Sequence, residues 1–89
     1  MRIRVLNSDV YVLKGTDDRF FHLATLTRGL HEYMVFFDDR DKKVFVEKIT
    51  GGHLEYVDDE SLWEELATFA QNKGLTDIAR TYIEKQKTK

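Results

Sequence analysis

The stretch that decides the fold runs from Leu30 to Val57 and reads LHEYMVFFDDRDKKVFVEKITGGHLEYV. Aromatic and β-branched residues, which suit the pleated surface of a sheet, alternate along residues 33–37 and recur along residues 44–50. The charged segment Asp38 to Lys43 separates these two runs, and Gly51-Gly52 can supply the positive φ angles that a two-residue hairpin turn requires. The stretch therefore predicts three antiparallel strands, joined by a solvated loop and a tight turn.

The two connections also predict the strand register. The Gly51-Gly52 turn places Thr50 opposite His53, Ile49 opposite Leu54, Lys48 opposite Glu55 and Val46 opposite Val57. A four-residue loop over residues 39–42 would place Phe36 opposite Phe45 and Val35 opposite Val46. One face of the sheet then carries Met34, Phe36, Phe45, Ile49, Leu54 and Tyr56, and the other carries Val35, Phe37, Val44, Val46 and Val57.

Both of these faces are apolar near the charged loop. An antiparallel sheet with one face in water normally alternates apolar and polar residues more cleanly than this. We therefore expect the face that carries Val35 and Phe37 to be covered as well. The cover could be the N-terminal strands, a curling of the sheet on itself, or another subunit.

The N-terminal third predicts further strands. Residues 2–6 and 10–14 flank the turn-forming Asn7-Ser8-Asp9, a pattern that favours a short hairpin. Residues 19–30 fit either a strand, which Thr25 and Thr27 favour, or a helix that Thr16 or Asp17 would cap. We expect a strand in this segment.

After Asp58 the apolar period changes to that of a helix. Asp58 is a suitable N-cap, Gly74 suits a helix end, and Thr76 can cap a second helix. We expect helices over about residues 59–73 and 76–86, with Leu62, Trp63, Leu66, Ala67, Phe69, Ala70, Ile78, Ala79, Tyr82 and Ile83 facing inward. The predicted fold class is α+β: one domain over residues 1–89, in which an antiparallel sheet of about four to six strands, a meander of hairpins over about residues 2–57, carries a C-terminal helical hairpin.

Composition narrows the classes of function. The 89 residues are 42% hydrophobic and 34% charged, carry a net charge of −2 and include no cysteine. The charge gives no general attraction to nucleic acid or to anionic membranes, and the lack of cysteine excludes disulfides and thiolate chemistry. No apolar run is long enough to span a bilayer and the N-terminus has no signal-like pattern, so we expect a cytoplasmic protein.

Motifs for catalysis and metal binding are weak. The two serines, Ser8 and Ser61, fall in a turn and at a helix start, without the base and orienting group that a nucleophile needs. His22, His31 and His53 lack the close spacing of zinc ligands. The loop Asp38-Asp39-Arg40-Asp41 lacks the glycine and the distal glutamate of a calcium loop. We therefore expect no catalytic residue, no metal and no cofactor.

Three functions remain open at this point. The first is a non-catalytic protein-interaction or regulatory module that acts through a protein partner or by self-association, such as a homodimer, with Tyr33, Phe37, Trp63 and Val57 as anchors. The second is a nucleic-acid-binding regulator that uses the helix–Gly74–helix segment or Arg2 and Arg4. The third is a small enzyme with carboxylate and histidine chemistry, for example His53 beside Glu55. The two-sided apolar sheet favours the first.

Overall fold

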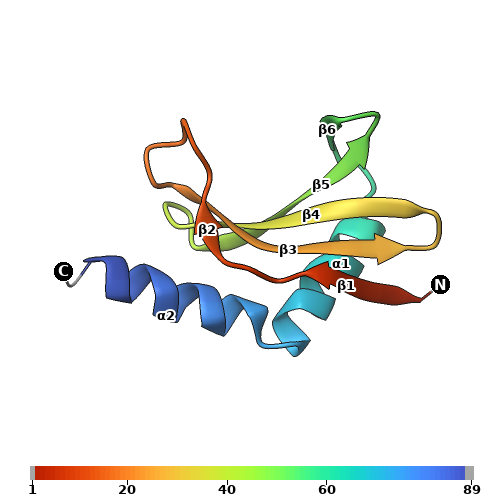
Figure 1. Ribbon diagram of the computed structural model, residues 1–89. Helices are drawn as coiled ribbons and strands as arrows, with labels where there is room; N and C mark the ends of the chain where they lie inside the picture. The colour runs from red at the N-terminus through yellow and green to blue at the C-terminus, as the bar shows by residue number, and fades with distance from the viewer. Residues whose placement is uncertain (1, 88–89) are drawn as a thin grey trace.

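The computed structural model describes residues 2–87 and consists of a curved antiparallel sheet with two helices on one side (Figure 1). The strands are β1 (Ile3–Asn7), β2 (Tyr11–Val12), β3 (Phe20–Arg28), β4 (His31–Asp38), β5 (Lys43–Thr50) and β6 (His53–Tyr56). The helices are α1 (Glu60–Asn72) and α2 (Leu75–Lys87). The α+β class and the order of strands before helices agree with the prediction.

Strands β3 to β6 form a meander in which each strand pairs with the next. The register matches the prediction where β4, β5 and β6 meet: Val35 pairs with Val46, Phe36 with Phe45, and Ile49 with Leu54. Gly51 and Gly52 have φ angles of 55° and 82°, so the turn has the geometry that its sequence favours. Pairing of β5 with β6 ends at Glu47 and Tyr56, one pair before the expected pair of Val46 and Val57.

The N-terminal hairpin that the sequence suggested is not formed. Instead, β1 pairs with residues 25–28 of β3, and β2 pairs with Phe21 and His22 of the same strand. The two short strands are therefore parts of one interrupted edge strand. Asn7 does make a local turn contact, because its Oδ1 accepts a hydrogen bond from the Asp9 backbone N–H at 2.8 Å, but the chain continues along β3 instead of reversing.

Both helix starts differ from the prediction. Asp59, not Asp58, is the N-cap of α1, and its Oδ1 accepts a hydrogen bond from the Leu62 backbone N–H at 3.2 Å. Gly74 has a φ of 74°, and its carbonyl oxygen accepts a hydrogen bond from Ile78 N–H at 3.1 Å. This bond closes the first turn of α2 from Gly74, so Thr76 lies inside the helix and does not cap it.

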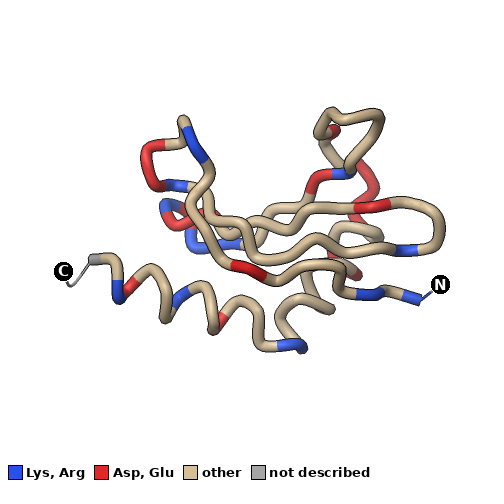
Figure 2. Tube along the Cα trace, in the orientation of Figure 1, with Lys and Arg blue, Asp and Glu red and all other residues tan. Residues whose placement is uncertain are grey.

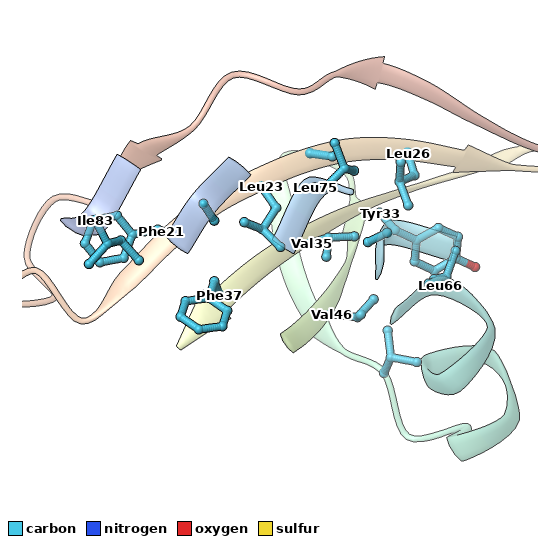
Figure 3. Close-up of a cluster of buried hydrophobic side chains, with 14 residues drawn as sticks. Phe21, Leu23, Leu26, Tyr33, Val35, Phe37, Val46, Leu66, Leu75 and Ile83 are labelled. Atoms are coloured by element: carbon cyan, nitrogen blue, oxygen red, sulfur yellow. The ribbon is translucent and has the colours of Figure 1, made fainter. Parts of the chain in front are cut away.

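The helices cover the face of the sheet that carries Val35 and Phe37 (Figure 3). The sheet contributes Leu23, Leu26, Tyr33, Val35, Phe37 and Val46 to this core, and the helices contribute Leu66, Ala70, Leu75, Ala79 and Ile83. The second apolar face is thus covered by the chain's own helices, not by the N-terminal strands, by curling of the sheet or by another subunit. Ile78, which was expected to face inward, is 52% exposed, and Leu75 is buried in its place.

Truncation of Leu66 tests which face of the sheet the helices cover. Its side chain is fully buried between α1 and the sheet, so Leu66→Ala should lower the free energy of unfolding by about 2–5 kcal/mol through lost burial and a residual cavity. Leu30→Ala is the matched control, because Leu30 is 99% exposed and its truncation should change stability by less than about 0.5 kcal/mol. Urea denaturation followed by circular dichroism measures both. Equal effects of the two substitutions would contradict the packing described.

Candidate binding face

The face of the sheet opposite the helices, called the open face below, carries a row of aromatic rings that crosses four strands. Tyr11 on β2 pairs with His22 on β3, His22 pairs with Phe36 on β4, and Phe36 pairs with Phe45 on β5. Directly paired residues of antiparallel strands project to the same face. The four rings therefore lie in one line across the sheet.

Ring–ring contacts hold the side chains at both ends of this row in place. Tyr11 stacks on His22 with ring centroids 4.6 Å apart and ring planes inclined by 17°. At the other end, Trp63 of α1 meets the Phe45 ring edge-on at a centroid distance of 5.0 Å. Tyr56 of β6 contacts Trp63 at 5.5 Å and Phe45 at 6.1 Å. The rings of Tyr56 and Trp63 thus extend the row from Phe45 to the start of α1.

The middle of the row is buried and hydrogen-bonded. His22 is 1% exposed, and its Nδ1 donates a hydrogen bond to the Asp9 carbonyl oxygen at 2.7 Å. The other ring nitrogen, Nε2, lies 3.1 Å from the Thr25 hydroxyl oxygen. The first of these bonds ties the break between β1 and β2 to β3. His22 therefore has a structural role, and its neighbour Phe36 is also buried.

An apolar surface lies at the β5–β6 end of the open face. We call it the hairpin patch: Leu54 and Tyr56 are its exposed members, and Met34, Phe45 and Ile49 are half-buried. Leu54 is 45% exposed and Tyr56 is 62% exposed, and the β5–β6 hairpin extends away from the helices (Figure 1). Glu32 pairs with Ile49, and Glu47 pairs with both Met34 and Tyr56, so both carboxylates lie on the same face as the patch. Figure 2 shows acidic positions along β4 and β5 near this hairpin.

Three of the four predicted anchors lie elsewhere. Tyr33, Phe37 and Val57 are 3%, 2% and 7% exposed and belong to the core beneath the helices. For Tyr33 and Phe37 the reason is the alternation along β4, which directs its odd-numbered residues toward α1 and α2. Burial leaves these three side chains unavailable to a partner as long as the protein stays folded. Trp63 is partly buried, and it contacts the aromatic row of the open face.

The predicted register placed Leu54 and Tyr56 on the face that the structure leaves open, but neither was predicted as an anchor for a protein partner. A signal for both was present. The inward residues of the two helices form one apolar surface, which can cover only one side of a single sheet. Apolar residues on the other side, next to a tight turn, are then the exposed ones.

The three histidines considered as metal ligands do not gather at one site. Within residues 2–87, no group of three or more histidine, aspartate or glutamate side chains is placed to hold a metal ion. His22 is buried in the aromatic row, whereas His31 and His53 are exposed at the starts of β4 and β6. His53 pairs with Thr50, and Glu55 pairs with Lys48.

Asp38, in the predicted charged loop, has a structural partner. Arg19 Nε and Nη2 each donate a hydrogen bond to its carboxylate at 2.9 Å. These bonds, helped by backbone N–H groups of Asp41 and Arg40 and opposed by burial, lower the pKa of Asp38 to about 2. The carboxylate is therefore ionised at neutral pH, and it joins the β4–β5 loop to the start of β3.

Comparisons of this chain with known protein families, with characterised proteins and with solved structures give no match. Across residues 2–87, neither helix is both long enough and apolar enough to cross a membrane.

The Arg19–Asp38 pair predicts a pH dependence of stability. Because folding lowers the pKa of Asp38, the pair stabilises the fold fully above about pH 4, the ordinary range of an aspartate, and its contribution is lost as the pH falls toward 2. Asp38→Asn should lower the urea midpoint at pH 7, and its difference from the unmodified protein should shrink between about pH 4 and pH 2.5. Asp41→Asn is the control. Asp41 makes a longer contact with Arg19, at 3.4 Å, and its side chain is half exposed, so this substitution should change the urea midpoint less than Asp38→Asn does. A difference for Asp38→Asn that stays constant over this range would contradict the assignment.

Proposed function

We propose that this chain is a small protein-binding module whose hairpin patch docks an apolar segment of a partner protein. The observation that carries the proposal is the exposure of Leu54 and Tyr56 on a projecting hairpin, beside a packed row of aromatic rings. Exposed apolar clusters on small proteins commonly mark interaction surfaces, and tyrosine and tryptophan are enriched among the residues that dominate binding energy.

The packing behind the patch favours binding. Tyr56 rests against Phe45 and Trp63, and Phe45 also contacts Phe20 at a centroid distance of 6.1 Å. A side chain that is already held by neighbouring rings loses little conformational freedom when a partner covers it. Tyr56 is therefore a pre-positioned anchor, with its remaining exposed surface free to be buried.

The charges around the patch favour a particular partner chemistry. Glu32 and Glu47 share the open face with the patch, and the chain as a whole carries a net charge of −2. A partner whose apolar segment is flanked by lysine or arginine would complement these carboxylates and would associate faster at low salt. Two copies meeting through this face would instead bring like charges together, so self-association is the less favoured form of the proposal.

The nucleic-acid alternative has weaker support. The helix–Gly74–helix segment directs Leu75, Ala79 and Ile83 into the core, and the exposed side of α2 carries Asp77 and Glu84, which phosphates would repel. A cytoplasmic location remains part of the proposal.

A differential capture experiment tests the proposal. Three forms of the full chain would be immobilised and exposed to lysate of the source cells at low salt: unmodified, Leu54→Ser with Tyr56→Ser, and Leu30→Ser. Leu30 is the matched control because it is apolar and 99% exposed but lies outside the hairpin patch. We expect a protein to be retained by the unmodified chain and by Leu30→Ser, and binding to the double variant to fall at least about tenfold through loss of two apolar anchors.

Two checks make the result decisive. Urea denaturation of the double variant should show stability within about 1 kcal/mol of the unmodified chain, because both side chains are exposed. Half of each sample would be treated with nuclease, which distinguishes a protein bound directly from nucleic acid and from proteins retained through nucleic acid. Bound material that disappears with nuclease, or a partner that the double variant retains fully, would contradict the proposal.

A further inference from the structure

The outer side of β6 is a free edge of the sheet. β6 is the last strand in the order β1-β3-β4-β5-β6, and all four of its residues are exposed. Thr50 and His53 close the two-residue turn as a hydrogen-bonded pair, and such pairs alternate with non-bonded pairs along an antiparallel ladder. Leu54 and Tyr56 belong to the non-bonded pairs. They therefore direct their backbone N–H and C=O groups away from β5, toward the free edge.

Leu54 and Tyr56 are also the exposed members of the hairpin patch. An extended segment that lies along β6 can thus bond to the backbone of these two residues and cover their side chains at the same time. Such a segment would continue the sheet by one strand, at the usual spacing of about 4.8 Å. Every second side chain of the segment would then lie on the open face.

The opposite edge of the sheet is protected against strand addition, whereas β6 is not. A register shift between Val5 and Asn7 interrupts the pairing of β1, and residues 8–10 separate β1 from β2. β1 also carries the exposed Arg4. Bulges, interruptions and basic side chains are common devices that keep other strands from an edge. β6 pairs with β5 without a register shift and contains neither lysine, arginine nor proline.

A cleft of about 340 Å³ lies at the end of β6, where the chain enters α1. Tyr56 and Trp63 line it, with ring centroids 5.5 Å apart. The charged residues of the lining are three carboxylates and one cation: Asp58, Glu60, Glu64 and Lys43. Within residues 2–87, none of these carboxylates forms an ion pair. Aromatic faces and carboxylates both attract cations, so the cleft suits a basic side chain.

We propose that β6 accepts an added antiparallel strand from the partner protein, with two apolar residues on the open face and a preceding basic residue in the cleft. This inference rests on the proposed function, because the added strand is the partner segment that the hairpin patch docks. The antiparallel direction gives the slightly more stable ladder and brings the N-terminal end of the segment to the cleft. The residue between the two apolar ones would lie beside Glu55, which favours a second basic residue there.

A short peptide tests the proposal on the full chain. The probe is acetyl-Arg-Ser-Ile-Lys-Ile-Thr-amide, in which the two isoleucines would pair with Tyr56 and Leu54 and the arginine would reach the cleft. Trp63 is the single tryptophan of the chain and lines the cleft, so its fluorescence reports binding. We expect a saturable change with a dissociation constant of about 1 mM or below.

Methylation of peptide nitrogens separates strand addition from contact between side chains alone. In the proposed register both isoleucine N–H groups donate to β6, whereas the lysine and threonine N–H groups point away from it. N-methylation at the two isoleucines should therefore weaken binding at least about tenfold. The matched control is N-methylation at the lysine and the threonine, which keeps the same side chains and number of methyl groups. It should weaken binding by less than about threefold.

A pair of substitutions tests the cleft. Glu60→Gln with Glu64→Gln removes two exposed carboxylates, and it should weaken binding of the peptide several-fold. The effect should disappear when glutamine replaces the arginine of the peptide, because the two changes then remove the same interaction. Glu84→Gln, at an exposed position of α2 outside this cleft, should bind as the unmodified chain does. Circular dichroism confirms that each variant is folded.

Several results would overturn the proposal. Equal weakening by the two methylation patterns would exclude strand addition, yet it would leave docking of side chains on the hairpin patch, and with it the proposed function, intact. No saturation below about 10 mM peptide would also overturn it. Sedimentation that shows the chain to be a dimer, which the peptide does not dissociate, would assign the edge to a second copy. Unchanged binding by the Glu60 and Glu64 double variant would overturn the role of the cleft.

Discussion

Alternation of side chains along β4 is the constraint on which the rest of the structure depends. Tyr33, Val35 and Phe37 project toward the helices, and the intervening Met34 and Phe36 project to the open face. A register shift of one residue would exchange the two sets. Val35 pairs with Val46 and Phe36 with Phe45, so Val46 faces the helices and Phe45 lies on the open face. Core and candidate binding surface are therefore set by one geometric rule.

Much of the fold could be predicted because its determinants are local. Gly51-Gly52 defines a turn and hence a register, and Thr25 and Thr27 correctly favour a strand for β3. The helix caps were wrong by one or two residues, but the larger errors involve contacts between distant segments. Residues 2–6 and 10–14 were expected to pair with each other, but β3 offers both of them a longer partner. Which face the helices cover also depends on the direction that the chain takes from β6 into α1. A short stretch of sequence does not determine that direction.

The candidate site was predicted only in part for the same reason. Of the proposed anchors, Trp63 lies beside the open face, while Tyr33, Phe37 and Val57 are in the core. Trp63 borders the hairpin patch because its ring contacts those of Phe45 and Tyr56. The open face therefore combines exposed apolar side chains with the carboxylates of Glu32 and Glu47.

Thiol reactivity tests most directly which face of the sheet is open. Because the chain has no cysteine, each introduced cysteine is a unique probe. In Leu54→Cys the thiol should react with a disulfide reagent nearly as fast as a free thiol, since Leu54 is 45% exposed. In Val46→Cys the thiol should react at least about a hundredfold more slowly, because Val46 is fully buried and is reached only when the structure opens. Equal rates, or faster reaction at position 46, would contradict the account.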